Sequence, residues 1–334
     1  MRATALICDE HRQFSLQEVV LPEPAAGQIA VRNVCSGVSI GTEFALIRGR
    51  LSWGPYPLCT GYMATGFVEA VGADVRGFRV GDAVYHRGNR RLAFPDGGSL
   101  SAVSGGHCSH AVLDPGGSHG AALLPEGVGF DVASLYVPPA VGLYGVDMGN
   151  PRMGETVVVH GVGLVGLGVV AACAHRGCVV IAADIVPGHL EIGRALGADY
   201  TIDARRDLAA QVRSIAPHGA DVVFECTGVP ACVNAAVELC RTDGTFVWQG
   251  NYGAAPVSFD FLPAHGRRLR MFFPCDDGFA PCRRAVIANM ARGALQWERT
   301  ITHRTAAAHA PALFERIDTG EEAGAVGVVL RWAD

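Results

Sequence analysis

Four continuous apolar runs in the second half of the chain constrain its fold more than any other feature. They read TVVVHG, CVVIAAD, DVVFECTG and GTFVWQG, and segments of helical length such as HLEIGRALGA and ACVNAAVELCR lie between them. Continuous apolar runs are typical of parallel strands that are buried on both faces of a sheet. Their alternation with helices predicts an α/β fold with a doubly wound parallel sheet.

The first of these runs ends in a glycine pattern that is typical of dinucleotide binding. Gly161, Gly163 and Gly166 form G-x-G-x-x-G, which here follows a predicted strand and opens a helix-compatible run. Gly161 permits the tight turn, Gly163 lets the backbone approach a pyrophosphate, and Gly166 allows close helix–strand packing. We expect a Rossmann domain with the pyrophosphate at the helix N-terminus, at Leu164 and Val165. The alternative is a glycine-rich packing turn in a helix or a membrane span.

The second run ends in Asp184, which bears on the identity of the dinucleotide. A carboxylate at this position accepts hydrogen bonds from the adenosine ribose hydroxyls, whereas a 2′-phosphate would meet a like charge. No arginine follows in ADIVPGH to offset that charge. The sequence therefore favours NAD over NADP. Further candidate cofactor-binding residues are Cys226, Thr227 and Gly250, which follow the next two strands.

The remainder of the chain has a different pattern. Residues 1–130 contain short alternating or β-branched runs broken by Gly, Pro and Asp, which predict a compact β-rich domain. After 268–273 the pattern is mixed, with a helix expected in PCRRAVIANMARG and a last strand in AVGVVLRW. A length of 334 residues suits two domains. We predict a catalytic domain over 1–140, completed by 275–334, and a dinucleotide-binding domain over 141–274.

Composition excludes several classes of function. The net charge of −5 does not favour binding to nucleic acid or to an anionic membrane. The chain contains no lysine, so a Schiff-base lysine, a Walker lysine and a Tyr-Lys catalytic pair are excluded. Its 11 cysteines include no CxxC, form an odd number that does not suit a disulfide framework, and lie mostly in apolar runs, which together indicate a reducing compartment. The N-terminus lacks the long apolar core of a signal peptide, so we expect a cytoplasmic protein.

Several stretches resemble the medium-chain dehydrogenase/reductase superfamily, over nearly the whole chain. They are VRNVCSGVSIGTEF, PLCTGYMATGFVEAVG, VGDAVY, LLPEGVGFDVASL, VVVHGVGLVGLGVVAACAHRGC, LGADYTID, DVVFECTG and RTDGTFVWQG. The resemblance implies a GroES-like β-barrel catalytic domain together with the Rossmann domain, and an active site in the cleft between them. It also implies a small-molecule substrate and a homodimer or homotetramer.

The resemblance breaks at the positions that bind catalytic zinc in many members. Where those members have a cysteine in GICGTD, this chain has Ser39 or Ile40 in GVSIGTE. The His and Glu of the GHE motif are replaced by Tyr62 and Met63, and the third ligand position by Val137.

The lobe that binds structural zinc would fall near 86–110, where Cys108 is the single cysteine. Zinc requires thiolate, imidazole or carboxylate ligands, so we predict that no metal is bound. The motif GTE together with PYPLCTGY is most similar to a zinc-lacking branch of the superfamily that includes bacteriochlorophyllide 3-hydroxyethyl dehydrogenase.

Four residues are candidates for the proton transfer and oxyanion stabilisation that zinc otherwise supports. Tyr62 stands in the place of the metal-binding histidine, where it either supplies a phenol to the reaction or fills the empty site. Thr42 matches a hydroxyl of the superfamily's proton relay, and Glu43 matches a motif acid that orients the site. His107 offers an imidazole base, and His110 is the weaker candidate because it begins a predicted strand.

Three functions remain open on the sequence. The leading hypothesis is a zinc-independent, NAD-dependent dehydrogenase that interconverts a secondary alcohol and a ketone on a cyclitol, a sugar or a secondary-metabolite intermediate. The second is a zinc-free, NAD(P)H-dependent reductase of the C=C bond of enones or quinones. The third is an inactive NAD-binding protein.

Overall fold

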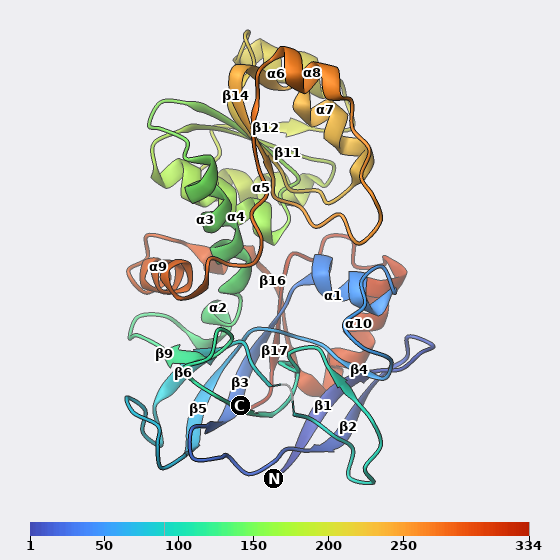
Figure 1. The fold of residues 1–334 in the computed structure, drawn as a ribbon, viewed down its shortest axis with the longest axis vertical. Helices are drawn as coiled ribbons and strands as arrows, with labels where there is room; N and C mark the ends of the chain where they lie inside the picture. The colour runs from blue at the N-terminus through green and yellow to red at the C-terminus, as the bar shows by residue number, and fades with distance from the viewer. Residues whose placement is uncertain (90, 334) are drawn as a thin grey trace. The chain divides into compact units, whose positions relative to one another are not determined.

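The structure is a computed structural model that describes residues 1–89 and 91–333 (Figure 1). The chain divides into two compact units. The first unit comprises Met1–Tyr136, Ile287–Ala294 and Ile301–Asp334, and the second comprises Val137–Val286 and Leu295–Thr300. The main boundaries lie at 136/137 and 286/287, whereas the sequence suggested 140/141 and 274/275. Residues 275–286 and 295–300, which were expected in the first domain, therefore belong to the second unit.

The second unit is built on a six-stranded sheet of order β12-β11-β10-β13-β14-β15, in which every neighbouring pair is parallel. The four apolar runs form β10, β11, β13 and β14, so the predicted doubly wound sheet is confirmed. The strands are β10 (Thr156–His160), β11 (Val179–Asp184), β12 (Tyr200–Asp203), β13 (Ala220–Glu225), β14 (Cys240–Trp248) and β15 (Arg270–Phe272).

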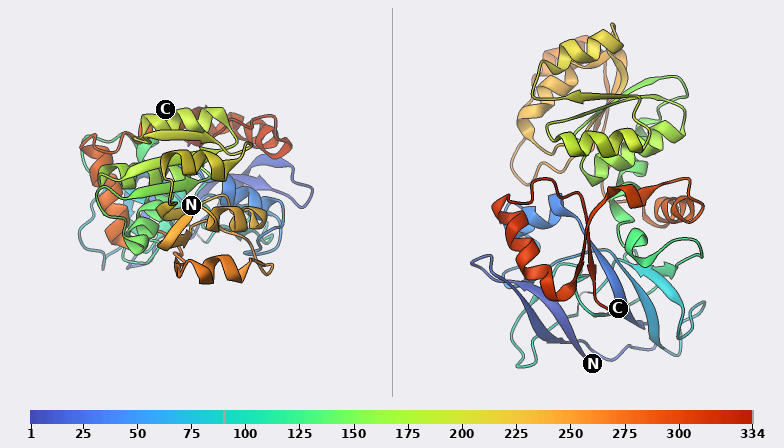
Figure 2. Two further views of the ribbon diagram at one scale, coloured as in Figure 1. Left: turned by 90° about the horizontal axis from the view of Figure 1, so that it is seen from above. Right: turned by 180° about the vertical axis from the view of Figure 1, so that it is seen from behind.

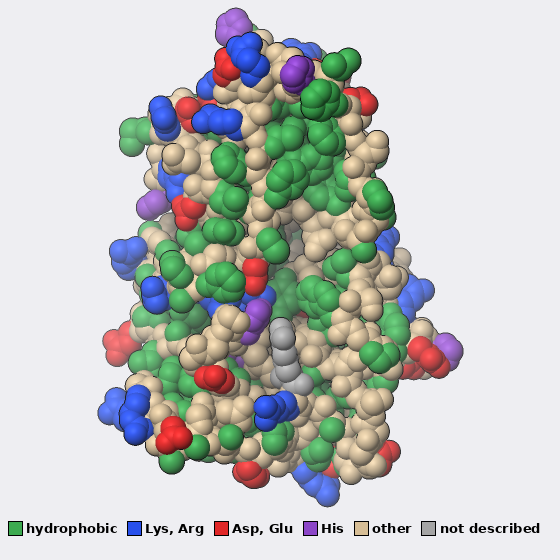
Figure 3. Space-filling view, in the orientation of Figure 1, with side chains coloured by type: hydrophobic (Ala, Val, Ile, Leu, Met, Phe, Trp, Pro, Cys, Tyr) green, Lys and Arg blue, Asp and Glu red, His purple; other side chains and the backbone are tan. Residues whose placement is uncertain are grey.

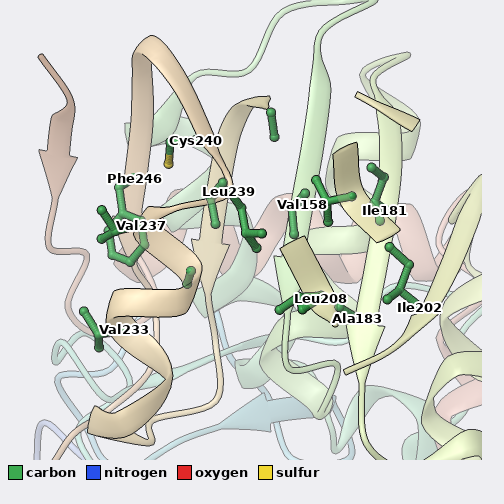
Figure 4. Close-up of a cluster of buried hydrophobic side chains, with 14 of the residues drawn as sticks. Val158, Ile181, Ala183, Ile202, Leu208, Val233, Val237, Leu239, Cys240 and Phe246 are labelled. Carbon is green, nitrogen blue, oxygen red and sulfur yellow. The ribbon is translucent and has the colours of Figure 1, made fainter. Parts of the chain in front are cut away.

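Helices cover both faces of this sheet. The helices of this unit are α3 (Val137–Gly149), α4 (Leu164–His175), α5 (Pro187–Ala195), α6 (Leu208–Ile215), η1 (Pro230–Cys232), α7 (Val233–Val237), α8 (Phe261–Gly266) and η2 (Trp297–Thr300). The helix α9 (Phe279–Ala291) begins in the second unit and ends in the first. On one face, Val158, Ile181 and Phe246 of the strands pack against Leu208 of α6 and Val233 of α7 (Figure 4).

The opposite face is covered by α3, α4 and α5, which glycines let approach closely. A Cβ on Gly142 of α3 would lie 2.8 Å from the backbone of α4, and one on Gly193 would touch Ala182 of β11. The sheet is therefore sandwiched between two helical layers.

The first unit contains two sheets. One has the order β2-β1-β4-β7, and the other has the order β16-β17-β3-β5-β6-β9 with β8 paired to β3. The strands are β1 (Arg2–Cys8), β2 (Phe14–Val20), β3 (Ile29–Val38), β4 (Leu58–Cys59), β5 (Ala64–Val71), β6 (Ala83–His86), β7 (Ser101–Ala102), β8 (His110–Leu113), β9 (Ala121–Leu123), β16 (Ile301–Ala306) and β17 (Gly327–Arg331). The helices are α1 (Ile40–Ile47), α2 (Phe130–Ala133), η3 (Ala307–His309) and α10 (Ala310–Thr319).

The C-terminal segment completes the first unit. Strand β17 pairs antiparallel with β3, so that Val328 lies opposite Val38, and the two strands run side by side in Figures 1 and 2. Phe314 of α10 packs against Phe44 of α1 with ring centroids 5.4 Å apart. The helix and the last strand expected near the end of the chain are thus present as α9 and β17.

No helix among the described residues has the length and the apolar character that a membrane span requires.

Candidate functional site

The loop after β10 has the geometry of a phosphate-binding turn. Gly161 has a φ of +89°, and a Cβ there would lie 2.9 Å from the backbone nitrogen of Thr227. A Cβ on Gly166 would lie 2.0 Å from the carbonyl oxygen of Gly161, so only glycine lets α4 approach the strand this closely. Gly163 differs, because a Cβ there would meet no atom within 4 Å. The space above Gly163 is open, and its backbone and that of Leu164 begin α4.

Asp184, the last residue of β11, holds this loop. Its Oδ2 accepts a 2.7 Å hydrogen bond from the Val162 N–H, and its Oδ1 accepts one of 2.9 Å from Val186. Burial raises the pKa of the Asp184 carboxyl, but hydrogen bonding to His189, Val186 and Val162 outweighs burial and lowers the pKa overall. The side chain is therefore ionised at neutral pH. His189 Nδ1 lies 3.6 Å from Oδ2.

A buried carboxylate organises the ends of the next two strands. Glu225, at the end of β13, is fully buried and accepts hydrogen bonds from the Thr227 N–H (3.1 Å), the Thr227 hydroxyl and the Tyr252 hydroxyl. Burial and the Glu225 charge raise the pKa of Tyr252, which therefore remains a donor. The Gly250 N–H donates to the Glu225 carbonyl at 2.8 Å. Glu225 thus ties the segment after β13 to the segment after β14.

These predicted cofactor-binding residues come together at one edge of the sheet. The carboxyl ends of the adjacent parallel strands β11, β10, β13 and β14 lead into Asp184, Gly161–Gly166, Cys226–Thr227 and Gly250, respectively. In open parallel sheets, ligands bind beyond the carboxyl ends of the strands. The helix N-terminus with its open glycine suits a pyrophosphate, and the ionised Asp184 suits a ribose. The residues present therefore fit a dinucleotide.

In the first unit, Tyr62 lies almost fully buried beside α1. Burial raises the pKa of its phenol, as does the Glu43 charge, whereas hydrogen bonding to the Ser39 and Thr42 side chains and the Arg87 charge oppose the rise. The Arg87 guanidinium stands over the Tyr62 ring, 5.3 Å from its centroid. Tyr62 is therefore a protonated donor, tied to the hydroxyl groups that the motif GVSIGTE supplies.

Glu43 and His107 form a closed pair behind Tyr62. Both side chains are fully buried, and His107 Nε2 lies 2.8 Å from Glu43 Oε2. The other carboxylate oxygen accepts a 2.7 Å hydrogen bond from the Ser39 N–H. The ring of His107 covers Gly61, where a Cβ would lie 2.8 Å from the ring. Because the pair is sealed in this way, His107 contacts Glu43 rather than an open cleft.

The residues at the zinc positions do not fit a zinc ion. Tyr62, Met63 and Val137 are all buried. None of these side chains is a thiolate, an imidazole or a carboxylate, which are the groups that bind zinc. Both ring nitrogens of His107, whose imidazole lies over Gly61, are hydrogen-bonded. Among the residues that the structure describes, no group of three His, Cys, Asp or Glu side chains could hold a metal ion.

Two other histidines lie apart from this pair. His110 begins β8 and lies 3.5 Å from Glu69, so its side chain does not join His107. His160 ends β10 in the second unit, 3.8 Å from Glu225, and burial lowers the pKa of its imidazole.

Sequence reasoning missed several members of these clusters. Ser36 and Trp332 contact the His107 pair through hydrogen bonds that span up to 296 residues, and no local pattern signals them. Glu225 did leave a signal, since it is an acidic residue inside an otherwise apolar run.

Comparison with known proteins places this architecture in a family. Residues 25–125 match the model of the alcohol dehydrogenase GroES-like domain, and residues 165–291 match that of zinc-binding dehydrogenases. The 2-desacetyl-2-hydroxyethyl bacteriochlorophyllide A dehydrogenase of Cereibacter sphaeroides is 30% identical, over 93% of this chain and 92% of its own. The chain belongs to the medium-chain dehydrogenase/reductase superfamily. The sorbitol dehydrogenase of Gallus gallus is 25% identical, over 95% of this chain and 94% of its own.

Solved structures of the superfamily share the fold. A protein of Sinorhizobium meliloti 1021 described as a zinc-binding dehydrogenase, solved with bound NADP, superposes with a TM-score of 0.85 at 24% identity, over 99% of each chain. As a member of the superfamily, this chain is an oxidoreductase of the alcohol and polyol dehydrogenase type, acts on CH–OH groups and uses a nicotinamide dinucleotide. The zinc in the family's description has no matching ligands among the described residues.

Proposed function

We propose that this protein is a zinc-independent, NAD-dependent dehydrogenase that interconverts a secondary alcohol and a ketone on a small organic molecule. Its substrate class is a cyclitol, a sugar or a secondary-metabolite intermediate. The observation that carries the proposal is that buried Tyr62 and Met63 occupy zinc-ligand positions, with the Ser39 and Thr42 side chains near enough to the Tyr62 phenol to lower its pKa. The sorbitol and bacteriochlorophyllide dehydrogenases among its relatives support an alcohol as the substrate.

The hydroxyl groups of Tyr62 and Thr42 carry the chemistry that the metal supports elsewhere. The bound nicotinamide dinucleotide supplies hydride transfer. In ketone reduction, Tyr62 gives its proton to the substrate oxygen as charge develops there, and in alcohol oxidation the Tyr62 phenolate takes the proton from the substrate hydroxyl. Tyr62 is buried, whereas Thr42 is only half-buried. The Thr42 hydroxyl therefore offers the proton a route between the phenol and solvent. Arg87 favours the transient phenolate by its positive charge.

NAD is preferred to NADP on electrostatic grounds. The Asp184 carboxylate stays ionised because its pKa is lowered by its hydrogen bonds. A 2′-phosphate would be placed against that charge, and residues 185–189 include no arginine to compensate. His189 is the one basic side chain in that segment.

We also propose that the protein acts as a homodimer or homotetramer and does not bind nucleic acid or membranes. Strand β15 is an edge of the six-stranded sheet among the described residues, and Phe273 beside it is 65% exposed. Phe261 and Leu262 of α8 are also exposed, and hydrophobic side chains gather over this part of the second unit (Figure 3). An open strand edge flanked by exposed apolar side chains suits pairing with a second copy.

The test follows nicotinamide absorbance after exhaustive treatment with a chelator. NAD and NADP are each offered with secondary alcohols, including cyclitols, sugars and hydroxyethyl-aryl compounds, and NADH and NADPH with enones and quinones. We expect turnover confined to the alcohols, faster with NAD, and unchanged by the chelator. Turnover confined to enones would identify a C=C reductase instead. Tight NAD binding without any turnover would identify an inactive binding protein.

A further inference from the structure

A chain of hydrogen-bonded side chains runs through the interior of the first unit and ends at Glu43. Trp332 Nε1 lies 2.8 Å from Ser36 Oγ, and Ser36 Oγ lies 2.9 Å from His107 Nδ1. His107 Nε2 then contacts Glu43 Oε2 at 2.8 Å. The Ser36, His107 and Glu43 side chains are fully buried, and Phe314 packs edge-on against the imidazole at 5.6 Å.

The chemistry of Trp332 gives this chain a direction. An indole nitrogen can only donate, so Ser36 Oγ must accept from it. The Ser36 hydroxyl proton then has one acceptor among its described partners, the Nδ1 of His107. An Nδ1 that accepts leaves the ring proton on Nε2, where it donates to Glu43 Oε2. In this arrangement every proton in the chain has an acceptor, which a buried network requires.

An imidazolium would break this match. With protons on both ring nitrogens, His107 and Trp332 would both donate to Ser36, whose own hydroxyl proton would be left without an acceptor. An unsatisfied buried polar group costs about 1–3 kcal/mol. The network therefore selects a neutral His107 against an ionised Glu43.

We propose that Ser36 and Trp332 are positioning residues of the catalytic cluster, which hold His107 as the Nε2-protonated tautomer and so keep Glu43 as a carboxylate beside Tyr62. The catalytic consequence rests on the proposed function, but the tautomer does not. A fixed carboxylate keeps Tyr62 protonated and ready to donate to the substrate oxygen.

The charged and titratable groups around the cluster are few. Glu43 of α1 and Arg87 after β6 act on Tyr62 with opposite sign. Cys59 of β4 lies against the His107 backbone, and burial raises the pKa of its thiol, which therefore stays neutral. Among the described residues whose charges act on Tyr62, Glu43 is thus the one whose charge depends on the direction of the hydrogen-bond chain.

The most informative variant exchanges the donor and acceptor roles in the hydrogen bond between His107 and residue 43. In Glu43→Gln, the amide oxygen can still accept from the Ser39 N–H, so the amide nitrogen must face His107 Nε2. His107 Nε2 then becomes the acceptor and the ring proton moves to Nδ1, at the cost that the Ser36 hydroxyl loses its acceptor. Loss of the negative charge also lowers the pKa of Tyr62, because Glu43 raises it in the native protein.

The experiment is 15N–1H NMR of the imidazole side chains of the full-length protein without substrate, with the His107 signal assigned from His107→Gln. The variants are Trp332→Phe, which keeps an aromatic ring in the core, Ser36→Ala and Glu43→Gln. Trp53→Phe is the matched control, since Trp53 is 55% exposed and takes part in none of the hydrogen bonds that link Trp332, Ser36, His107 and Glu43. The pH profile of ketone reduction, in which Tyr62 gives its proton to the substrate oxygen, is then measured for each variant.

We expect a neutral Nε2–H tautomer for His107 in the native protein and in Trp53→Phe, a mixture of tautomers in Trp332→Phe and Ser36→Ala, and Nδ1–H in Glu43→Gln. The alkaline limb of the pH profile should move to lower pH in Glu43→Gln, because the pKa of Tyr62 falls. In Trp332→Phe it should move in the same direction by a smaller amount. An imidazolium or an Nδ1–H tautomer in the native protein would overturn the assignment. A native Nε2–H signal that persists in Trp332→Phe and Ser36→Ala, with an unmoved pH profile, would overturn the positioning role. Absence of native turnover would instead count against the proposed function, and the NMR result would still decide the tautomer.

Discussion

Replacing two glycines of the phosphate loop should separate cofactor binding from folding. Gly163 and Gly166 belong to the same motif, yet a Cβ on Gly163 would enter open space while one on Gly166 would lie 2.0 Å from the Gly161 carbonyl oxygen. Gly163→Ala is therefore expected to fold, and Gly166→Ala is expected to strain the contact between α4 and the loop.

The magnitudes follow from these contacts. Gly163 has φ −66° and ψ −175°, which alanine adopts freely, and the loss of a glycine N-cap costs about 1 kcal/mol or less. Its methyl group would fill the space of the pyrophosphate, and each lost charge-assisted hydrogen bond is worth ~1.5–3 kcal/mol. The Kd for NAD should rise by roughly 10- to 150-fold.

For Gly166→Ala, overpacking against rigid backbone costs ~1–3 kcal/mol, of which helix propensity returns up to ~1. A net loss of about 2 kcal/mol would lower the Tm by roughly 4–8 °C.

The assay is calorimetric titration with NAD together with thermal unfolding. Gly266→Ala in α8 is the matched control, because its Cβ also meets nothing within 4 Å and it lies outside the loop. If Gly163→Ala binds NAD within about twofold of the native protein, the pyrophosphate does not pass over this residue and the assignment of the loop is wrong.

Three further predictions rest on single side chains. Tyr62→Phe should lower kcat by about 10²- to 10³-fold with little change in KM, since it removes a donor to the developing oxyanion, and an unchanged kcat in steady-state assays would reduce Tyr62 to packing. Asp184→Asn should weaken the binding of NAD and lower the ratio of kcat/KM for NAD to kcat/KM for NADP. An unaltered ratio would show that Asp184 does not discriminate between the two cofactors. Desolvation lowers the pKa of the buried His86 from 6.5 to about 4 in the folded protein. As the pH falls, the unfolded chain therefore binds a proton at His86 at a higher pH than the folded protein does. The free energy of unfolding should therefore fall by about 3 kcal/mol as the pH drops from ~6.5 to ~4, and His86→Gln should flatten that slope in denaturant titrations.

The second unit could be predicted closely because its signals are local. The glycines at 161, 163 and 166, the strand before them and Asp184 lie within one short stretch, and the structure places them together at the carboxyl edge of the sheet. The replacement of the zinc ligands by Tyr62 and Met63 was also visible, because a motif fixed their positions.

The proton-transfer cluster could be predicted only in part. Glu43 and His107 were both candidates, but their direct contact joins α1 to a loop 64 residues away, and no periodicity encodes such a pairing. Trp332 is further still from Ser36 in sequence. Side chains that meet only through tertiary packing leave no trace in composition or spacing, so the direction of the buried chain needed coordinates.

The return of the chain to its first unit has a consequence for biosynthesis. A ribosome releases β3 and α1 long before it releases β17 and α10, against which they pack. Until then, β3 can pair with β5 and β8 but has no partner on the side that β17 takes, and the apolar face that α10 covers is exposed. The second unit is contiguous apart from the short segment Leu295–Thr300, so it can fold while synthesis continues. The second unit can therefore fold before the first unit is complete, and Trp332 can fix the proton position on His107 only after β17 has paired with β3.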